Sequence, residues 1–166
     1  LLDQILKKFP SQILALQLKA YIYLKLQNYK SCLLVLNQLV THDCSDYYHT
    51  ETLLHEVIKC APDLVISARY LLCLLYYQQN LVDQCVEECK KLKGSRIDLK
   101  VQLLLAQIDL KQHQFSDFQE KGAVLLSQNP FYTDLHKLLQ QGYIYQQSEA
   151  FHDLPDQQHP LYSFEK

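Results

Sequence analysis

Apolar residues recur along this chain at spacings of three and four, a pattern typical of amphipathic helices. Residues 1–9 carry such a stripe, and Pro10 ends it. In residues 11–26 the apolar positions cover more than one face, so we expect this helix to have neighbours on several sides. The pattern predicts helices over residues 1–9, 11–26, 29–40, 50–59, 64–79, 81–92, 97–112, 115–128 and 133–147, with Ser11 and Thr50 as N-caps.

Short polar connections separate these predicted helices. They are Gln27-Asn28, Asn80, Gly94-Ser95, His113-Gln114 and Asn129-Pro130. Two helices of similar length joined by a minimal turn form an antiparallel hairpin. Strand-rich folds and phosphate-binding loops need many glycines, and this chain has 3. The sequence therefore predicts an all-α fold. An extended tail, or alternatively a cap on the last helix, is predicted over residues 148–166, which contain Pro155 and Pro160 but no helical period.

Composition narrows the classes of protein further. The 166 residues are 48% hydrophobic with a formal charge of -2, which excludes disorder for most of the length. No basic excess indicates nucleic-acid binding, and no apolar run is long enough for membrane insertion. Cysteines within leucine-rich helical patterns indicate a reducing, intracellular compartment, the cytoplasm with the nucleus as an alternative. Because the chain begins at Leu1 and has no Met, we expect it to be a segment of a longer repeat array.

A repeat length emerges from the prolines. Pro62 and Pro130 are 68 residues apart, which is two units of 34. In the last unit Leu105-Ala106 supplies a leucine and a small residue, Phe115 opens the next helix, and Asn129-Pro130 closes the unit. With these features the chain resembles the tetratricopeptide (TPR) family over residues 1–147. The resemblance implies one domain of about eight or nine helices, a right-handed α-α superhelix of antiparallel hairpins.

Several positions depart from the family pattern. Lys19 stands where a leucine is usual, Leu72 where a small residue is expected, and Phe118 where alanine is expected. Pro10 and Pro62 are 52 residues apart, which is 18 residues more than one repeat of 34. The helix over residues 50–59 is therefore supernumerary, or it belongs to a unit whose partner helix has shrunk.

The TPR resemblance also implies where a partner would bind, because the first helix of each hairpin lines the concave face in that family. The residues expected to contact a partner in this groove are Gln17, Tyr21, Lys25, Arg69, Tyr76, Tyr77, Lys100, Gln107, Lys111, Lys137, Gln141 and Tyr145. The resemblance places eight further residues on the same face: Leu14, Leu24, Ile66, Cys73, Leu103, Leu110, Asp134 and Ile144. Tyrosine and basic residues with exposed leucine suit a peptide groove. We expect charge reversal at Arg69 and Lys111 to abolish partner capture without unfolding the chain. The alternative is that the tyrosines pack against neighbouring helices and the lysines are only solvated.

Metal and catalytic chemistry are disfavoured. His42, Cys44, His49 and His55 are of zinc-ligand types, but their spacing is irregular, so we expect no metal site and no cofactor. No phosphate-binding loop, nucleophile elbow or zinc-protease motif occurs. A metal- or thiol-dependent enzyme that uses those four residues is the least favoured alternative.

The favoured function is a non-catalytic protein–protein interaction module or scaffold that is part of a larger protein or complex. It would bind an acidic or amphipathic protein or peptide in its concave groove. Self-association through the ends of the solenoid is also expected, since a truncated array exposes apolar surface. A bacterial secretion chaperone with TPR repeats is the alternative.

Overall fold

The structure is a computed structural model that describes residues 4, 7–8, 12–41 and 47–152. Its internal contacts divide the chain into two compact units, Leu1–Val101 and Gln102–Lys166. Within the described ranges the regular structure is entirely helical, with eight α-helices, one short 3-10 helix and no strand. The predicted helix over residues 1–9 lies largely outside the described residues, as do Pro10, Ser11, Pro155 and Pro160. The all-α prediction is confirmed.

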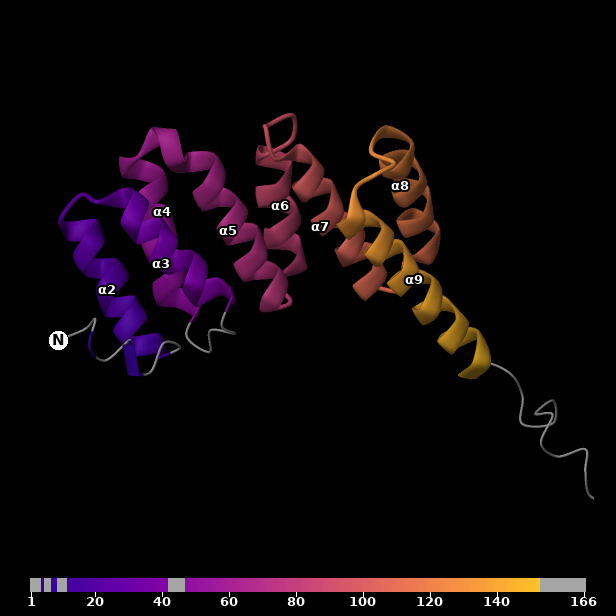
Figure 1. Cartoon of the computed structure of the whole chain (residues 1–166), viewed down its shortest axis with the longest axis horizontal. Helices are drawn as coiled ribbons and strands as arrows, with labels where there is room; N and C mark the ends of the chain where they lie inside the picture. The colour runs from indigo at the N-terminus through magenta and orange to yellow at the C-terminus, as the bar shows by residue number, and fades with distance from the viewer. Residues whose placement is uncertain (1–3, 5–6, 9–11, 42–46, 153–166) are drawn as a thin grey trace, which may run out of the picture. The chain divides into compact units, whose positions relative to one another are not determined.

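Unit 1 contains five complete α-helices and the start of a sixth (Figure 1). These are α2 (Ile13–Lys25), α3 (Tyr29–Thr41), α4 (Tyr47–Cys60), α5 (Val65–Gln78), α6 (Val82–Lys91) and the first turn of α7 (Asp98–Lys111), with the 3-10 helix η1 (Pro62–Leu64) before α5. Each α-helix from α2 to α6 packs against its neighbours in sequence, and α2 and α3 form the closest pair. Their shared core includes the fully buried side chains Leu36, Leu54 and Leu72.

Unit 2 holds the rest of α7 together with α8 (Phe115–Gln128) and α9 (Thr133–His152). Two glycines let α8 and α9 approach closely. A Cβ on Gly142 would overlap the ring of Phe118, and a Cβ on Gly122 would overlap the side chain of Leu139. Phe118 stands where the family pattern has alanine, and its large ring fits against α9 because Gly142 has no side chain. Close packing of α8 against α9 therefore accounts for both glycines.

Three tight turns share one backbone geometry. Gln27, Asn80 and His113 have φ values of 56°, 59° and 60°, in the left-handed region. After each of them the next amide donates to a carbonyl five residues earlier, as from Asn28 to Tyr23 at 2.9 Å. This is the Schellman motif, which satisfies the last carbonyls of a helix. The turns predicted at these three positions are confirmed, although glycine is the residue that usually occupies them.

Two helix boundaries differ from the prediction by more than two residues. Thr50 is fully buried inside α4, which starts at Tyr47, so Thr50 does not cap that helix. Helix α9 continues to His152, five residues beyond the predicted end at Gln147. The remainder of the predicted tail, residues 153–166, lies outside the described residues. In the part of the chain that the structure describes, no helix combines the length and the apolar character needed to cross a membrane.

The extra helix α4 is full length. It has 14 residues and packs against α5, α3 and α2. The phenol of Tyr76 on α5 donates a hydrogen bond of 2.6 Å to the Glu51 carboxylate on α4. Burial and this hydrogen bond both raise the pKa of Tyr76 above its usual value. Helix α4 is thus integrated into unit 1.

Candidate functional site

Helices α2 and α4 enclose a groove of about 720 Å³, which we call the α2–α4 groove. Its lining residues are Leu14, Gln17, Leu18, Tyr21, Leu24 and Lys25 from α2, and Tyr48, His49, Thr52, Leu53 and Glu56 from α4. The groove lies wholly within unit 1. It contains Gln17, Tyr21 and Lys25, three of the residues that the sequence nominates for partner binding.

The groove is apolar because α2 has apolar residues on both of its faces. Leu16 and Ala20 are buried in unit 1. Leu14, Leu18 and Tyr21, spaced four and three residues apart, are 73%, 50% and 48% exposed. Single exposed apolar side chains are ordinary, whereas a contiguous row beside a hollow marks an interaction surface.

Charges of both signs lie in the α2–α4 groove. The Lys25 ammonium is 5.2 Å from the centre of the Tyr21 ring, a cation–π contact. Across the groove, a hydrogen bond from Lys59 lowers the pKa of Glu56, and the charge of Lys25 adds to this effect. The predicted basic character of the groove is therefore balanced here by the carboxylate of Glu56.

The structure corrects two of the predicted groove residues. Tyr76 is 5% exposed and hydrogen-bonded to α4, so it does not line an open surface. Arg69 donates a hydrogen bond of 2.8 Å to Glu88 on α6, a residue that is 6% exposed. Lys91 binds the other oxygen of the same carboxylate at 2.7 Å. Arg69 is thus engaged in an ion pair within unit 1, so we expect charge reversal at this residue to perturb the fold as well as any binding.

The remaining nominated residues are distributed over both units. Tyr77 is half-buried on α5, and Lys100 lies in the first turn of α7, within unit 1. In unit 2, Gln107 is half-buried, and the other four are exposed: Lys111, Lys137, Gln141 and Tyr145. None of these seven residues lines the α2–α4 groove.

The α2–α4 groove contains residues that the sequence analysis did not select. Leu18 was counted only among the apolar positions of its helix, and the whole α4 side of the groove was missed. The available signal was the excess of apolar residues around the helix at 13–25, which predicted neighbours on several sides. Nothing in the sequence showed that α4 would supply the opposite wall.

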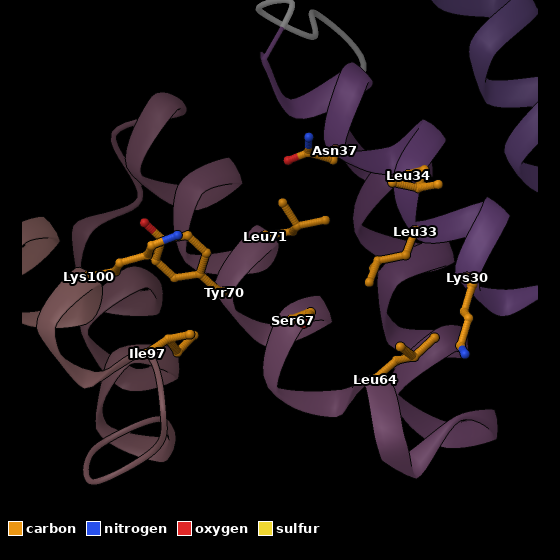
Figure 2. Close-up of a pocket in the computed structure, with 10 residues that line it drawn as sticks. All are labelled: Lys30, Leu33, Leu34, Asn37, Leu64, Ser67, Tyr70, Leu71, Ile97 and Lys100. Carbon is orange, nitrogen blue, oxygen red and sulfur yellow. The ribbon is translucent and has the colours of Figure 1, made fainter.

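A second hollow, of about 480 Å³, lies over α3, α5 and the start of α7, and we call it the α3–α5 groove (Figure 2). Its lining residues are Lys30, Leu33, Leu34, Asn37, Leu64, Ser67, Tyr70, Leu71, Ile97 and Lys100. It also lies wholly within unit 1. Of its residues the sequence analysis nominated Lys100 alone.

In comparisons with known protein families, curated proteins and solved structures, none matches this chain.

The cysteines in the described helices are mostly core residues. Cys32, Cys73, Cys85 and Cys89 are at most 1% exposed, as expected for thiols in leucine-rich helical patterns. Cys85 Sγ donates to the backbone oxygen of Cys73 at 3.1 Å, and burial raises the pKa of Cys32 to about 11. These environments make the thiols packing groups.

The four residues of zinc-ligand type, for which no metal site is expected, are only partly described. His42 and Cys44 lie outside the described residues. His49 lines the α2–α4 groove, and His55 Nε2 lies 3.8 Å from Glu51 one turn earlier on α4. Among the described residues no group of three or more metal-ligating side chains converges.

Proposed function

We propose that this chain is a non-catalytic protein–protein interaction module whose α2–α4 groove binds a segment of another protein. The observation that carries the proposal is the row of exposed Leu14, Leu18 and Tyr21 along a groove of about 720 Å³. Burying an exposed leucine against a partner contributes roughly 1–3 kcal/mol, so a few such contacts suffice for a specific complex.

The polar groups of the groove define the kind of partner. The lining side chains Gln17, Thr52 and His49 can donate or accept hydrogen bonds, and Lys25 and Glu56 add one charge of each sign. An amphipathic segment fits this lining, because its apolar side chains meet the leucines while its polar groups meet the rim. A purely acidic segment would face Glu56 unfavourably.

We also propose that the chain belongs to the TPR-like α-solenoids. The repeated Schellman turns support this architecture, as does the sequence of short helices that pack against their neighbours. Ala106, the small residue of the repeat pattern, is 0% exposed, which agrees with close helix contacts. Helix α4 is then an insertion that forms one wall of the groove. A soluble scaffold in the cytoplasm or nucleus is the setting we propose.

Affinity capture from the cells that express the protein tests the proposed function. We expect at least one polypeptide to co-purify with the unaltered chain and to be lost, by about tenfold or more, from Leu18→Asp. Val124→Asp is the matched control, because Val124 is exposed to the same extent, 51% against 50% for Leu18, and lies on α8 outside both hollows described above. Both variants should keep the far-UV circular dichroism of the parent. If no captured polypeptide depends on Leu18, the proposed function is wrong.

A further inference from the structure

We infer that the α3–α5 groove is a second binding site, independent of the α2–α4 groove. Its ligand is an extended protein segment in which apolar side chains are flanked on both sides by carboxylates. The two grooves share no lining residue, although both lie in unit 1. The inference does not depend on the function proposed for the α2–α4 groove.

The floor of the α3–α5 groove is apolar. Leu33 and Leu71 extend into its centre from α3 and α5, with Leu64 below them in the view (Figure 2). Leu34 on the rim is 68% exposed, and the contact of this apolar side chain with water is unfavourable. This floor favours aliphatic side chains in a ligand.

Two ammonium groups stand at the ends of the groove. Figure 2 shows Lys30 on the α3 side and Lys100 on the α7 side, with the side chains of α5 between them. Among the described residues that line the groove none is a carboxylate, and neither α3 nor α5 contains an aspartate or glutamate. Asp98, near Lys100 in sequence, accepts a hydrogen bond of 2.9 Å from the amide of Gly94. The charge of the groove is therefore positive at both ends, which complements acidic groups on a ligand.

Lys30 and Lys100 differ from four other basic residues of unit 1, whose charges are paired. Lys59, Arg69, Lys90 and Lys91 each form an ion pair with a glutamate. Within the part of the chain that the structure describes, no such ion pair involves Lys30 or Lys100. Both ammonium groups are thus available to a ligand carboxylate.

The separation of the two lysines indicates a polypeptide ligand. Figure 2 shows side chains of α5 between Lys30 on α3 and Lys100 on α7, so the two lysines lie on opposite sides of the groove. A single small carboxylate can therefore pair with only one of them at a time. An extended chain advances about 3.3 Å per residue, so acidic residues several positions apart in a polypeptide can reach both.

Charge reversal at these positions is compatible with the fold. Lys30 is the second residue of α3 and Lys100 the third of α7, and both side chains are exposed. Acidic residues are favoured in the first turn of a helix, where they complement the helix dipole. Lys30→Glu and Lys100→Glu should therefore fold like the parent, and circular dichroism verifies this before binding is measured.

Selection of peptides from a random display library against the full chain tests the inference. We expect a class of enriched peptides with apolar residues flanked on both sides by Asp or Glu. Their synthetic forms, measured by fluorescence anisotropy, should bind Lys30→Glu or Lys100→Glu roughly 3- to 10-fold more weakly, and the double variant more weakly still. Lys93→Glu, an exposed lysine outside both grooves, is the matched control and should change affinity less than about twofold. Added salt should weaken binding to the parent.

Several outcomes would overturn the inference. One is a selection that yields no peptide class dependent on Lys30 and Lys100, or peptides without flanking acids. A second outcome is that the parent chain binds dodecanoate and that Lys100→Glu lowers the affinity. This would indicate that the ligand is a small carboxylate. A third is concentration-dependent self-association in sedimentation velocity that Leu34→Asp abolishes, which would make a second copy of the chain the occupant. If Leu18→Asp loses peptide binding, the peptide binds in the α2–α4 groove and not in the α3–α5 groove.

Discussion

The ion pair between Arg69 and Glu88 makes a quantitative prediction about stability. Glu88 is 6% exposed and receives hydrogen bonds from Arg69 at 2.8 Å and Lys91 at 2.7 Å. Arg69→Met keeps most of the aliphatic volume but leaves one buried carboxylate oxygen without its cation. Removing one partner of a fully buried pair costs about 3–5 kcal/mol, and a hydrogen bond to a charged group contributes about 1.5–3. Because Lys91 remains and Arg69 is 27% exposed, we expect a loss of about 1–3 kcal/mol in unfolding free energy.

The pH dependence of this loss follows from the pKa of Glu88. Burial raises that pKa, but the hydrogen bonds from Lys91 and Arg69 outweigh burial and hold it below its usual value. A carboxyl whose pKa is lowered by folding contributes stability above its unfolded pKa of about 4.3, and the contribution disappears as pH falls through the folded pKa. The difference between parent and Arg69→Met should therefore be largest near pH 7 and shrink below about pH 4.

Urea unfolding followed by far-UV circular dichroism measures both effects. Thiol labelling near neutral pH reports the opening of α6 directly, because Cys85 and Cys89 are buried on that helix. Lys90→Met is the control: Lys90 lies on the same helix, 3.6 Å from Glu87 in an exposed pair, and its loss should cost less than about 0.5 kcal/mol. The reasoning is refuted if Arg69→Met costs no more than Lys90→Met, or if its cost is undiminished near pH 3.

Three further predictions concern packing, turns and thiols. Gly142→Ala should destabilise unit 2 by about 1–3 kcal/mol in a urea titration, because the added Cβ overlaps the Phe118 ring; full stability would contradict this close contact. Gln27→Gly should raise the unfolding free energy by roughly 0.5–1 kcal/mol, since glycine adopts its φ of 56° without strain, and an unchanged or lowered melting temperature would argue against this turn geometry. Cys60 is exposed, whereas Cys32 is buried, so mass spectrometry of natively alkylated protein should show Cys60 modified first; equal rates would contradict the burial.

The helical fold could be predicted from the sequence because its determinants are local. Helix α8 has the predicted limits, Phe115 and Gln128, since apolar periodicity and turn residues mark both ends. Helix α9 runs past Gln147 because a polar, glutamine-rich segment can remain helical without an apolar stripe. The left-handed turn at His113 was placed correctly, although its φ could not be predicted without a glycine.

The candidate site could be predicted only where it depends on one helix. Gln17, Tyr21 and Lys25 share a face of α2, and helical spacing alone places them together. The burial of Tyr76 depends on Glu51, 25 residues earlier, and Arg69 meets Glu88 across 19 residues. The packing of α4 and α6 onto α5 determines these pairings. A local sequence pattern does not predict that packing.

Site-specific photo-crosslinking tests the central claim, that the α2–α4 groove holds a segment of another protein. A photoreactive amino acid would replace Leu18 in the groove or, as a control, Gln38, which is exposed on α3 and outside both grooves. The proposal predicts that the photoreactive residue at position 18 forms a covalent adduct with a defined polypeptide in the expressing cells. The photoreactive residue at position 38 should form no adduct with that polypeptide. Equal adducts from both positions, or adducts from position 38 alone, would contradict it.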